Sequence, residues 1–197
     1  SYTAIMGHLG VDAAAANSVS AVVRDLICCA CNGVGSAAGI MVGNELGAGN
    51  LEKGKLYGER LMRISLVIGV ISMVLVLLLV PVVPRLFRLS DMAQEYLKDM
   101  LTIIAVYMVA RSANEIVING IFASGGDTVF NMYSLAVCMW GISIPLSALG
   151  AFVFRWPVWV VYACTCLDET GKIPWVFAHY KKYKWVRNLT REIICDE

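Results

Sequence analysis

The chain has 197 residues and a formal net charge of +1, with 58% hydrophobic and only 16% charged residues. An ordinary soluble domain has about 45–50% apolar and about 25% charged residues, and one of this length could not enclose so much apolar surface in a single core. The composition therefore predicts a protein that lies in the lipid bilayer. The sequence has no basic stripe of the kind that nucleic acid requires, so we expect no nucleic-acid partner.

Five segments are long and apolar enough to cross a membrane as helices, which takes about 20 residues with few central charges. The predicted spans cover residues 12–43, 63–83, 100–123, 132–154 and 156–180, separated by turn-forming residues at 47–50, 81–84, 124–128 and 155–157. The fifth span is the weakest because it contains Asp168, Glu169 and Lys172. The prediction is an all-α fold, a polytopic transmembrane helix bundle of about five spans over residues 1–180.

Lysine and arginine residues lie mostly on one side of these spans. That side has nine of them against four on the other: Lys53, Lys55, Arg60, Arg63, Lys181, Lys182, Lys184, Arg187 and Arg191 against Arg85, Arg88, Lys98 and Arg155. Short cytoplasmic loops usually carry the excess of positive charge. We therefore expect a multi-pass protein of the plasma (inner) membrane whose basic tail, residues 181–197, is cytoplasmic.

Glycines recur every fourth residue in and just after the first span, at Gly35, Gly39, Gly43 and Gly47. This spacing places them on one helix face, where another backbone can approach closely, and close packing supplies much of the attraction between helices in lipid. Each glycine inside a helix costs about 1 kcal/mol relative to alanine in water. The pattern predicts a close partner helix, which we expect to lie outside this chain.

Ionisable residues inside membrane spans are costly and are therefore candidates for function. Arg24 and Asp25 lie near the middle of the first span. As sequence neighbours they point in different directions, so we expect each to pair with another helix. Arg111 and Glu115 are four residues apart in the third span, a spacing at which two side chains meet on one helix face.

The fifth span adds Asp168, Glu169 and Lys172, so the spans hold three cations and four carboxylates in all. A surplus carboxylate in a membrane tends to stay protonated or to hold a cation, because burial opposes its charged form. Glu115 is the first candidate for binding a cation or substrate, with Asn114 and Asn119 as nearby oxygen ligands; a local ion pair with Arg111 is the alternative. Asp168 and Glu169 are the second candidates.

Residues 42–50 read Val-Gly-Asn-Glu-Leu-Gly-Ala-Gly-Asn, with Asn44, Gly47 and Gly49 as the marked positions. This stretch resembles the multidrug and toxic compound extrusion (MATE) family at the loop after the eighth of its twelve helices. Residues 123–128 are similar to the family's Arg-Gly-Ala-Gly-Asp-Thr pattern after the tenth helix, although Ala123 and Ser124 replace Arg-Gly. The basic tail around Trp185 resembles the end that follows the twelfth helix.

The resemblance implies that the chain forms helices eight to twelve, most of the C-terminal six-helix lobe. The chain begins without an initiator Met or a signal peptide, so we expect a longer parent protein whose N-terminal lobe is a partner of this part. Such transporters export organic cations or other amphiphiles while Na⁺ or H⁺ moves inward, and need no other cofactor. An essential carboxylate of the family often lies on the first or seventh helix, outside this chain.

Other functions compete with export. A flippase for lipid-linked sugars, of the same superfamily, would need several cavity cations, and the chain offers only Arg24 and Arg111 at mid-depth. A membrane enzyme is disfavoured because no nucleophile–base pair or His-Glu-x-x-His motif lies within a span. A non-transporting subunit would have little use for charged spans. The Cys28–Cys29–Cys31 cluster has no nearby histidine or second cysteine pair, so we expect no metal site.

Overall fold

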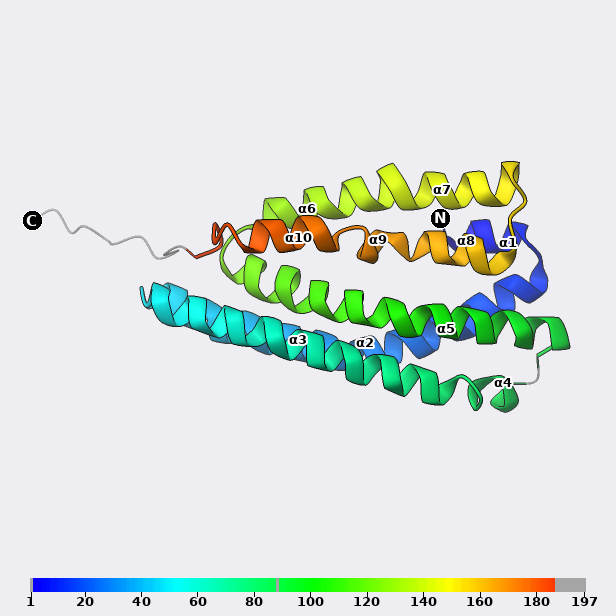
Figure 1. Ribbon diagram of the computed structural model, residues 1–197, viewed down its shortest axis with the longest axis horizontal. Helices are drawn as coiled ribbons and strands as arrows, with labels where there is room; N and C mark the ends of the chain where they lie inside the picture. Colours follow the sequence, from blue (N-terminus) through cyan, green and yellow to red (C-terminus); the bar gives the residue numbers. More distant parts are fainter. Residues whose placement is uncertain (1, 88, 187–197) are drawn as a thin grey trace, which may run out of the picture.

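The computed structural model describes residues 2–87 and 89–186; Arg88 and residues 187–197 of the predicted tail lie outside the described residues. Every regular element in the described part is a helix (Figure 1). In chain order the elements are α1 (Tyr2–His8), α2 (Val11–Gly47), α3 (Leu51–Leu79), α4 (Val83–Leu86), α5 (Asp91–Asn114), η1 (Glu115–Phe122), α6 (Thr128–Ala136), η2 (Val137–Ser143), α7 (Ile144–Ala148), η3 (Leu149–Val153), α8 (Val158–Thr165), α9 (Leu167–Thr170) and α10 (Ile173–Tyr180). The η elements are wider π-helical turns that continue the preceding α-helices.

Four helices of the described part are long and apolar enough to cross a membrane: Val11–Gly47, Leu51–Leu79, Asp91–Phe122 and Thr128–Val153. They overlap the first four predicted spans, and the predicted all-α, polytopic fold is confirmed. The helix Leu51–Leu79 begins earlier than predicted because its charged first turns are also helical. It ends at Leu79, just before Pro81, which has no N–H to continue the helix.

The fifth predicted span, residues 156–180, is three short helices (α8, α9 and α10) instead of one. Pro174 lacks the N–H that would bond back across the break before α10. At the end of α8, the Thr165 hydroxyl donates to the Tyr162 carbonyl at 2.6 Å, and such local side-chain bonds compete with the regular helix. The break therefore follows from local chemistry that the hydropathy of the segment does not reveal.

The long helices run side by side along the longest axis of the molecule (Figure 1). Helix α2 packs against α3, α5 and η1, while the segment α8–α10 packs between α5 and the helix that runs from α6 to η3. One face of α3 carries a series of exposed apolar side chains: Leu66, Val67, Val70, Ile71, Val74, Leu75 and Leu78. So large an exposed apolar surface is typical of contact with lipid.

Two apolar cores fill the two ends of the bundle. The first core joins the first half of α2, the end of α3, most of α5 and α8. The second core joins the end of α2, the start of α3, η1 and α10. Between them lies a set of buried polar side chains, called the polar layer below: Ser65, Ser112, Asn114, Glu169 and Lys172. The Ser112 hydroxyl donates to the Ser65 carbonyl at 3.3 Å, which ties α5 to α3 within this layer.

The glycine face of α2 packs against η1. A Cβ atom added at Gly35 would lie 3.4 Å from the Glu115 carbonyl oxygen, and one at Gly39 would lie 3.4 Å from the Gly120 carbonyl oxygen. A Cβ at Gly43 would lie 3.5 Å from the Ser124 Cβ. The predicted close partner is therefore confirmed, but the expectation that it lies outside the chain is wrong. Gly120 of η1 offers the matching small surface, so two helix backbones approach each other there.

Replacing Gly120 by alanine is expected to destabilise the protein by about 1–3 kcal/mol, the usual effect of forcing extra atoms into a packed interface. The new Cβ would lie 2.9 Å from the Gly35 carbonyl oxygen, so α2 and η1 must separate. Gly33→Ala is the matched control, because nothing lies within 4 Å of a Cβ there. Thermal unfolding of the full-length protein in detergent measures the stability of both variants. Equal unfolding midpoints for Gly120→Ala and Gly33→Ala would contradict the close contact.

The segment after α10 folds back onto the bundle; residues 180–186 are called the C-terminal clasp below. The Trp185 side chain is fully buried, and a side chain at Gly58 of α3 or at Gly125 would overlap it. Tyr183 donates a hydrogen bond to Glu59 at 2.9 Å, and this bond raises the pKa of Tyr183 by favouring its neutral form. These contacts bring the clasp, the start of α3 and the loop before α6 to one end of the bundle.

Candidate functional site

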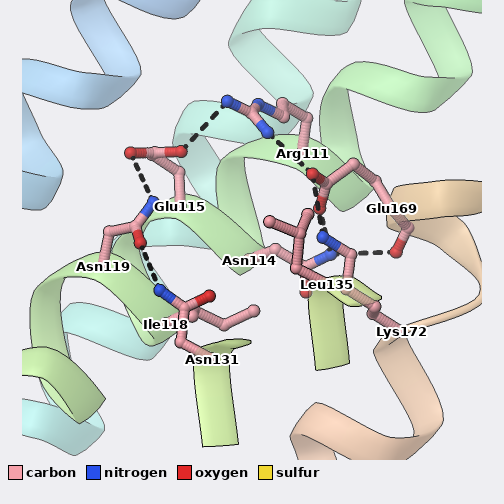
Figure 2. Close-up of a pocket in the computed structure, with 9 residues that line it drawn as sticks. All are labelled: Arg111, Asn114, Glu115, Ile118, Asn119, Asn131, Leu135, Glu169 and Lys172. Carbon is pink, nitrogen blue, oxygen red and sulfur yellow. Dashed lines mark hydrogen bonds and ion pairs between the residues drawn. The ribbon is translucent and has the colours of Figure 1, made fainter. Parts of the chain in front are cut away.

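A network of charged and amide side chains lies midway along the bundle (Figure 2). Arg111 of α5 contacts two carboxylates, Glu169 of α9 at 2.7 Å and Glu115 of η1 at 3.3 Å. Glu169 also lies 3.1 Å from the Lys172 ammonium and accepts a hydrogen bond from Asn114 at 2.8 Å. The ion pair of Glu115 with Arg111, which the sequence offered as the alternative to a binding role, is present in the structure. Helix α9 supplies a second acid that the spacing alone did not assign to Arg111.

Two charged side chains of this network are deeply buried. The side chains of Glu169 and Lys172 are only 4% and 5% exposed, while Arg111 is 32% exposed. A buried carboxylate is costly unless cations and hydrogen-bond donors surround it. Glu169 meets that condition with two cations and one amide, and the two acids balance the two bases of the network. The local arrangement is therefore electrically neutral and held in one geometry by five side chains.

Glu115 connects the network to the fourth spanning helix through amides. Its carboxylate accepts from the Asn119 amide at 2.9 Å, and the Asn119 oxygen accepts from Asn131 of α6 at 3.1 Å. In the amide orientation that satisfies both of its polar atoms, Asn32 of α2 also donates to Glu115, at 3.2 Å. Asn114 and Asn119 therefore act here as N–H donors to carboxylates, whereas the sequence suggested them as oxygen ligands.

Two cavities border the network. The central cavity, of about 190 Å³, is lined by Arg111, Glu115, Asn119 and Lys172, among others (Figure 2). The second cavity, of about 420 Å³, lies between α1, α2, α5 and α9. Arg111 lines both cavities, so its two ion pairs lie at the boundary between them.

Arg24 and Asp25 line the second cavity but pair with each other, with 3.0 Å between the guanidinium and the carboxylate. The expectation that each finds a partner on another helix is wrong, because the long arginine side chain turns back to its neighbour. The Asp25 side chain is 68% exposed, whereas the network acids Glu115 and Glu169 are 11% and 4% exposed. Asp168 lines the same cavity. The predicted candidates thus form two groups. Glu115, Asn119 and Glu169 line the central cavity. Arg24, Asp25 and Asp168 line the second cavity, and Arg111 lines both.

A family model described as MatE matches residues 1–149, about three quarters of the chain. The chain belongs to the MatE family. No curated protein and no solved structure matches it. MatE proteins are membrane transporters, so the resemblance noted from the motifs is confirmed and this MatE chain is a multi-pass transporter protein.

The first motif of this MatE chain forms the turn between α2 and α3. The Asn44 carbonyl accepts from the Ala48 N–H at 2.9 Å, and the Asn50 N–H donates to the Glu45 carbonyl at 2.9 Å. Gly49 has a φ of 77°, a left-handed conformation that glycine adopts without strain. Asn44, Gly47 and Gly49 therefore shape the end of α2, and they lie away from the charged network.

The second motif of this MatE chain contacts α10. The Asp127 carboxylate forms a short hydrogen bond with His179, whose ring stacks on Phe130 with 3.8 Å between centroids. Sequence reasoning missed the contact between Asp127 and His179. It also missed Asn131 and did not connect Asn114 with Glu169. The available signal for Asn131 was an asparagine directly before the fourth predicted span.

Proposed function

We propose that this MatE chain forms most of the C-terminal lobe of a secondary transporter that exports organic cations or other amphiphiles while Na⁺ or H⁺ moves inward. The observation that carries the proposal is the buried Arg111–Glu169–Lys172 cluster, which borders a cavity in the middle of the bundle. Ionisable groups at membrane depth are costly and mark ion and substrate pathways. The coupling ion is the only small cofactor that this activity requires.

The interrupted fifth segment supports the same proposal. Many secondary transporters bind substrate and coupling ions near the bilayer midplane, beside helices that are broken there. In this chain α9 lies between two breaks, and its Glu169 contacts α5 through Arg111 and Asn114. Such a break would help a lobe that changes its contacts during transport. Three short helices can change their relative angles, whereas one long helix would have to unwind.

The proposal includes the setting of the chain. Its partners are the bilayer, the N-terminal lobe of the parent protein and a small amphiphilic or cationic substrate. We place the protein in the plasma (inner) membrane with the C-terminal clasp on the cytoplasmic side. The basic residues near the start of α3 and in the clasp support this side, including Lys53, Lys55, Lys181 and Lys182.

A lipid-linked sugar flippase is the second candidate, and the ion pairs disfavour it. A pyrophosphate group would require cations that are not already neutralised. Among the described residues, the in-span cations Arg24, Arg111 and Lys172 each lie within 3.1 Å of a carboxylate. These cavities therefore offer no surplus of positive charge to an anionic lipid.

Efflux of ethidium from drug-hypersensitive cells that carry the full parent protein tests the proposal. We expect efflux that collapses when the inward H⁺ or Na⁺ gradient is removed. Glu115→Gln should lower it on the order of tenfold, because a hydrogen bond to a charged group contributes about 1.5–3 kcal/mol and the charge facing Arg111 is lost. Glu52→Gln, at the exposed start of α3, is the control at equal expression. No efflux of any tested cation under either gradient would contradict export and favour the flippase.

A further inference from the structure

The acids within the spans are nearly all paired in the described part of the chain. Asp25 pairs with Arg24 at 3.0 Å, and Glu115 with Arg111 at 3.3 Å. Glu169 has both Arg111 and Lys172, at 2.7 and 3.1 Å. The surplus carboxylate that the sequence implied can therefore be located by elimination. It is the side chain of Asp168, for which no ion pair occurs among the described residues.

Asp168 is also incompletely hydrogen-bonded. Its Oδ1 atom has less than 1 Å² of exposed surface and no hydrogen-bond partner among the described protein atoms. Glu169, the next residue, has three partners for its carboxylate. The two neighbouring acids thus have opposite surroundings. The network neutralises Glu169, while Asp168 keeps an acceptor oxygen without a donor among the described residues. A buried acceptor of this kind is costly unless a proton, an ion or water satisfies it.

The cavity next to Asp168 has room for such a partner. Asp168 and Tyr2 both line the second cavity, and the buried Tyr2 hydroxyl likewise has no hydrogen-bond partner within the described part of the chain. At about 420 Å³ the cavity is far larger than one water needs. The two cations that line it, Arg24 and Arg111, are already paired with other acids. The unpaired carboxylate therefore makes this cavity a site for a small hard cation.

We propose that Asp168 is the group in this lobe that binds and releases the coupling cation, a proton or Na⁺, and that Glu115 and Glu169 position Arg111 and Lys172. This inference rests on the proposed function. When the ion is a proton, a hydronium ion entering the second cavity supplies it: one of its O–H bonds breaks as an O–H bond forms on the Asp168 carboxylate, leaving water. The new bond breaks when the proton returns to water on the other side. When the ion is Na⁺, the carboxylate and the Tyr2 oxygen are ligands of the type it prefers.

The placement of Asp168 on α9 supports this role. The four-residue helix lies between the end of α8 at Thr165 and the start of α10 at Ile173. A change in the angle of either neighbour would move Asp168 relative to the cavity wall on α2 and α5. Binding and release on opposite sides require such a change of surroundings, because an ion moves only when its affinity differs between two conformations.

Reconstitution of the full-length protein in liposomes tests the inference with two measurements. The first is ethidium transport driven by an imposed H⁺ gradient or, separately, an imposed Na⁺ gradient. The second is ethidium binding without any gradient. For Asp168→Asn we expect gradient-driven transport to fall at least tenfold under the gradient that drives the wild type, with binding changed less than about twofold. Asp168→Glu, which keeps a carboxylate, should restore part of the transport.

The matched control is Asp99→Asn, the same change at an exposed position of α5. If the gradient drives ethidium transport by Asp168→Asn as well as by the wild type, the inference is wrong and the export proposal is unaffected. An equal loss of binding in Asp168→Asn would overturn it too, because the group would then belong to the substrate site. A wild-type protein that neither gradient drives would contradict the proposed function itself, which separates the two failures.

Discussion

Replacing Arg111 by leucine is expected to destabilise the protein by about 3–5 kcal/mol, the usual effect of removing one partner of a buried ion pair. The guanidinium lies 2.7 Å from Glu169 and 3.3 Å from Glu115, and the Glu169 side chain is only 4% exposed. Without Arg111 the network holds two acids and one base. Chemical unfolding in detergent of the full-length protein would measure the loss, and ethidium efflux should be lost as well.

Arg24→Leu is the matched control, since it removes the same charge from another spanning helix. Among the described residues Arg24 pairs with Asp25 alone, and the Asp25 side chain is 68% exposed, so we expect a change in unfolding free energy of about 0–1 kcal/mol. Arg111→Lys should lie between the two, because an ammonium cannot reproduce the two-pronged contact of a guanidinium. Equal destabilisation by Arg24→Leu and Arg111→Leu would show that the network adds nothing to an isolated ion pair.

Trp185→Ala is expected to cost about 3–5 kcal/mol, the range for large aromatic residues removed from a packed core. The indole is fully buried, stacks on Tyr180 with 5.9 Å between centroids, and occupies the space left by Gly58. Its loss should also release the C-terminal clasp, so trypsin should cut faster at Lys181, Lys182 and Lys184. Unfolding of the full-length protein and the rate of cleavage are the two measurements.

Trp140→Ala is the control for this change. The Trp140 side chain is 63% exposed on the fourth spanning helix, so its removal leaves no internal space. We expect the unfolding midpoint and the cleavage of the clasp to stay close to those of the wild type. If Trp185→Ala behaved like Trp140→Ala, the clasp would not contribute to the stability of the bundle.

The features that could be predicted from the sequence depend on residues that are close together in the chain. Apolar length located four spanning helices, and the four-residue spacing of glycines identified the face of α2 that packs closely. The same short-range geometry allowed the contact of Arg111 with Glu115, four residues further along one helix face. Each of these contacts depends on residues within one or two helical turns.

The rest depends on the relative positions of helices far apart in the chain. Asn114 and Glu169 are 55 residues apart, and no periodicity indicates that they meet. Asp168 and Glu169 look equivalent in the sequence, yet only Glu169 points into the network of cations. The pairing of Arg24 with its neighbour was also missed, because backbone direction says little about a side chain with four rotatable bonds. Similarly, the partner of the glycine face could not be identified as η1 before the packing was known.

The polar layer divides the bundle into two apolar halves, one at each end of the long helices. Helices α2 and α3 and the continuous helix formed by α5 and η1 run through both halves, and Ile68 touches both cores. The fifth segment does not: α8 belongs to the first core and α10 to the second, with α9 between them. Relative tilting of the halves would leave each core packed and would concentrate the displacement at α9. The segment that would move most is then the one that carries two acids of the fifth segment, Asp168 and Glu169.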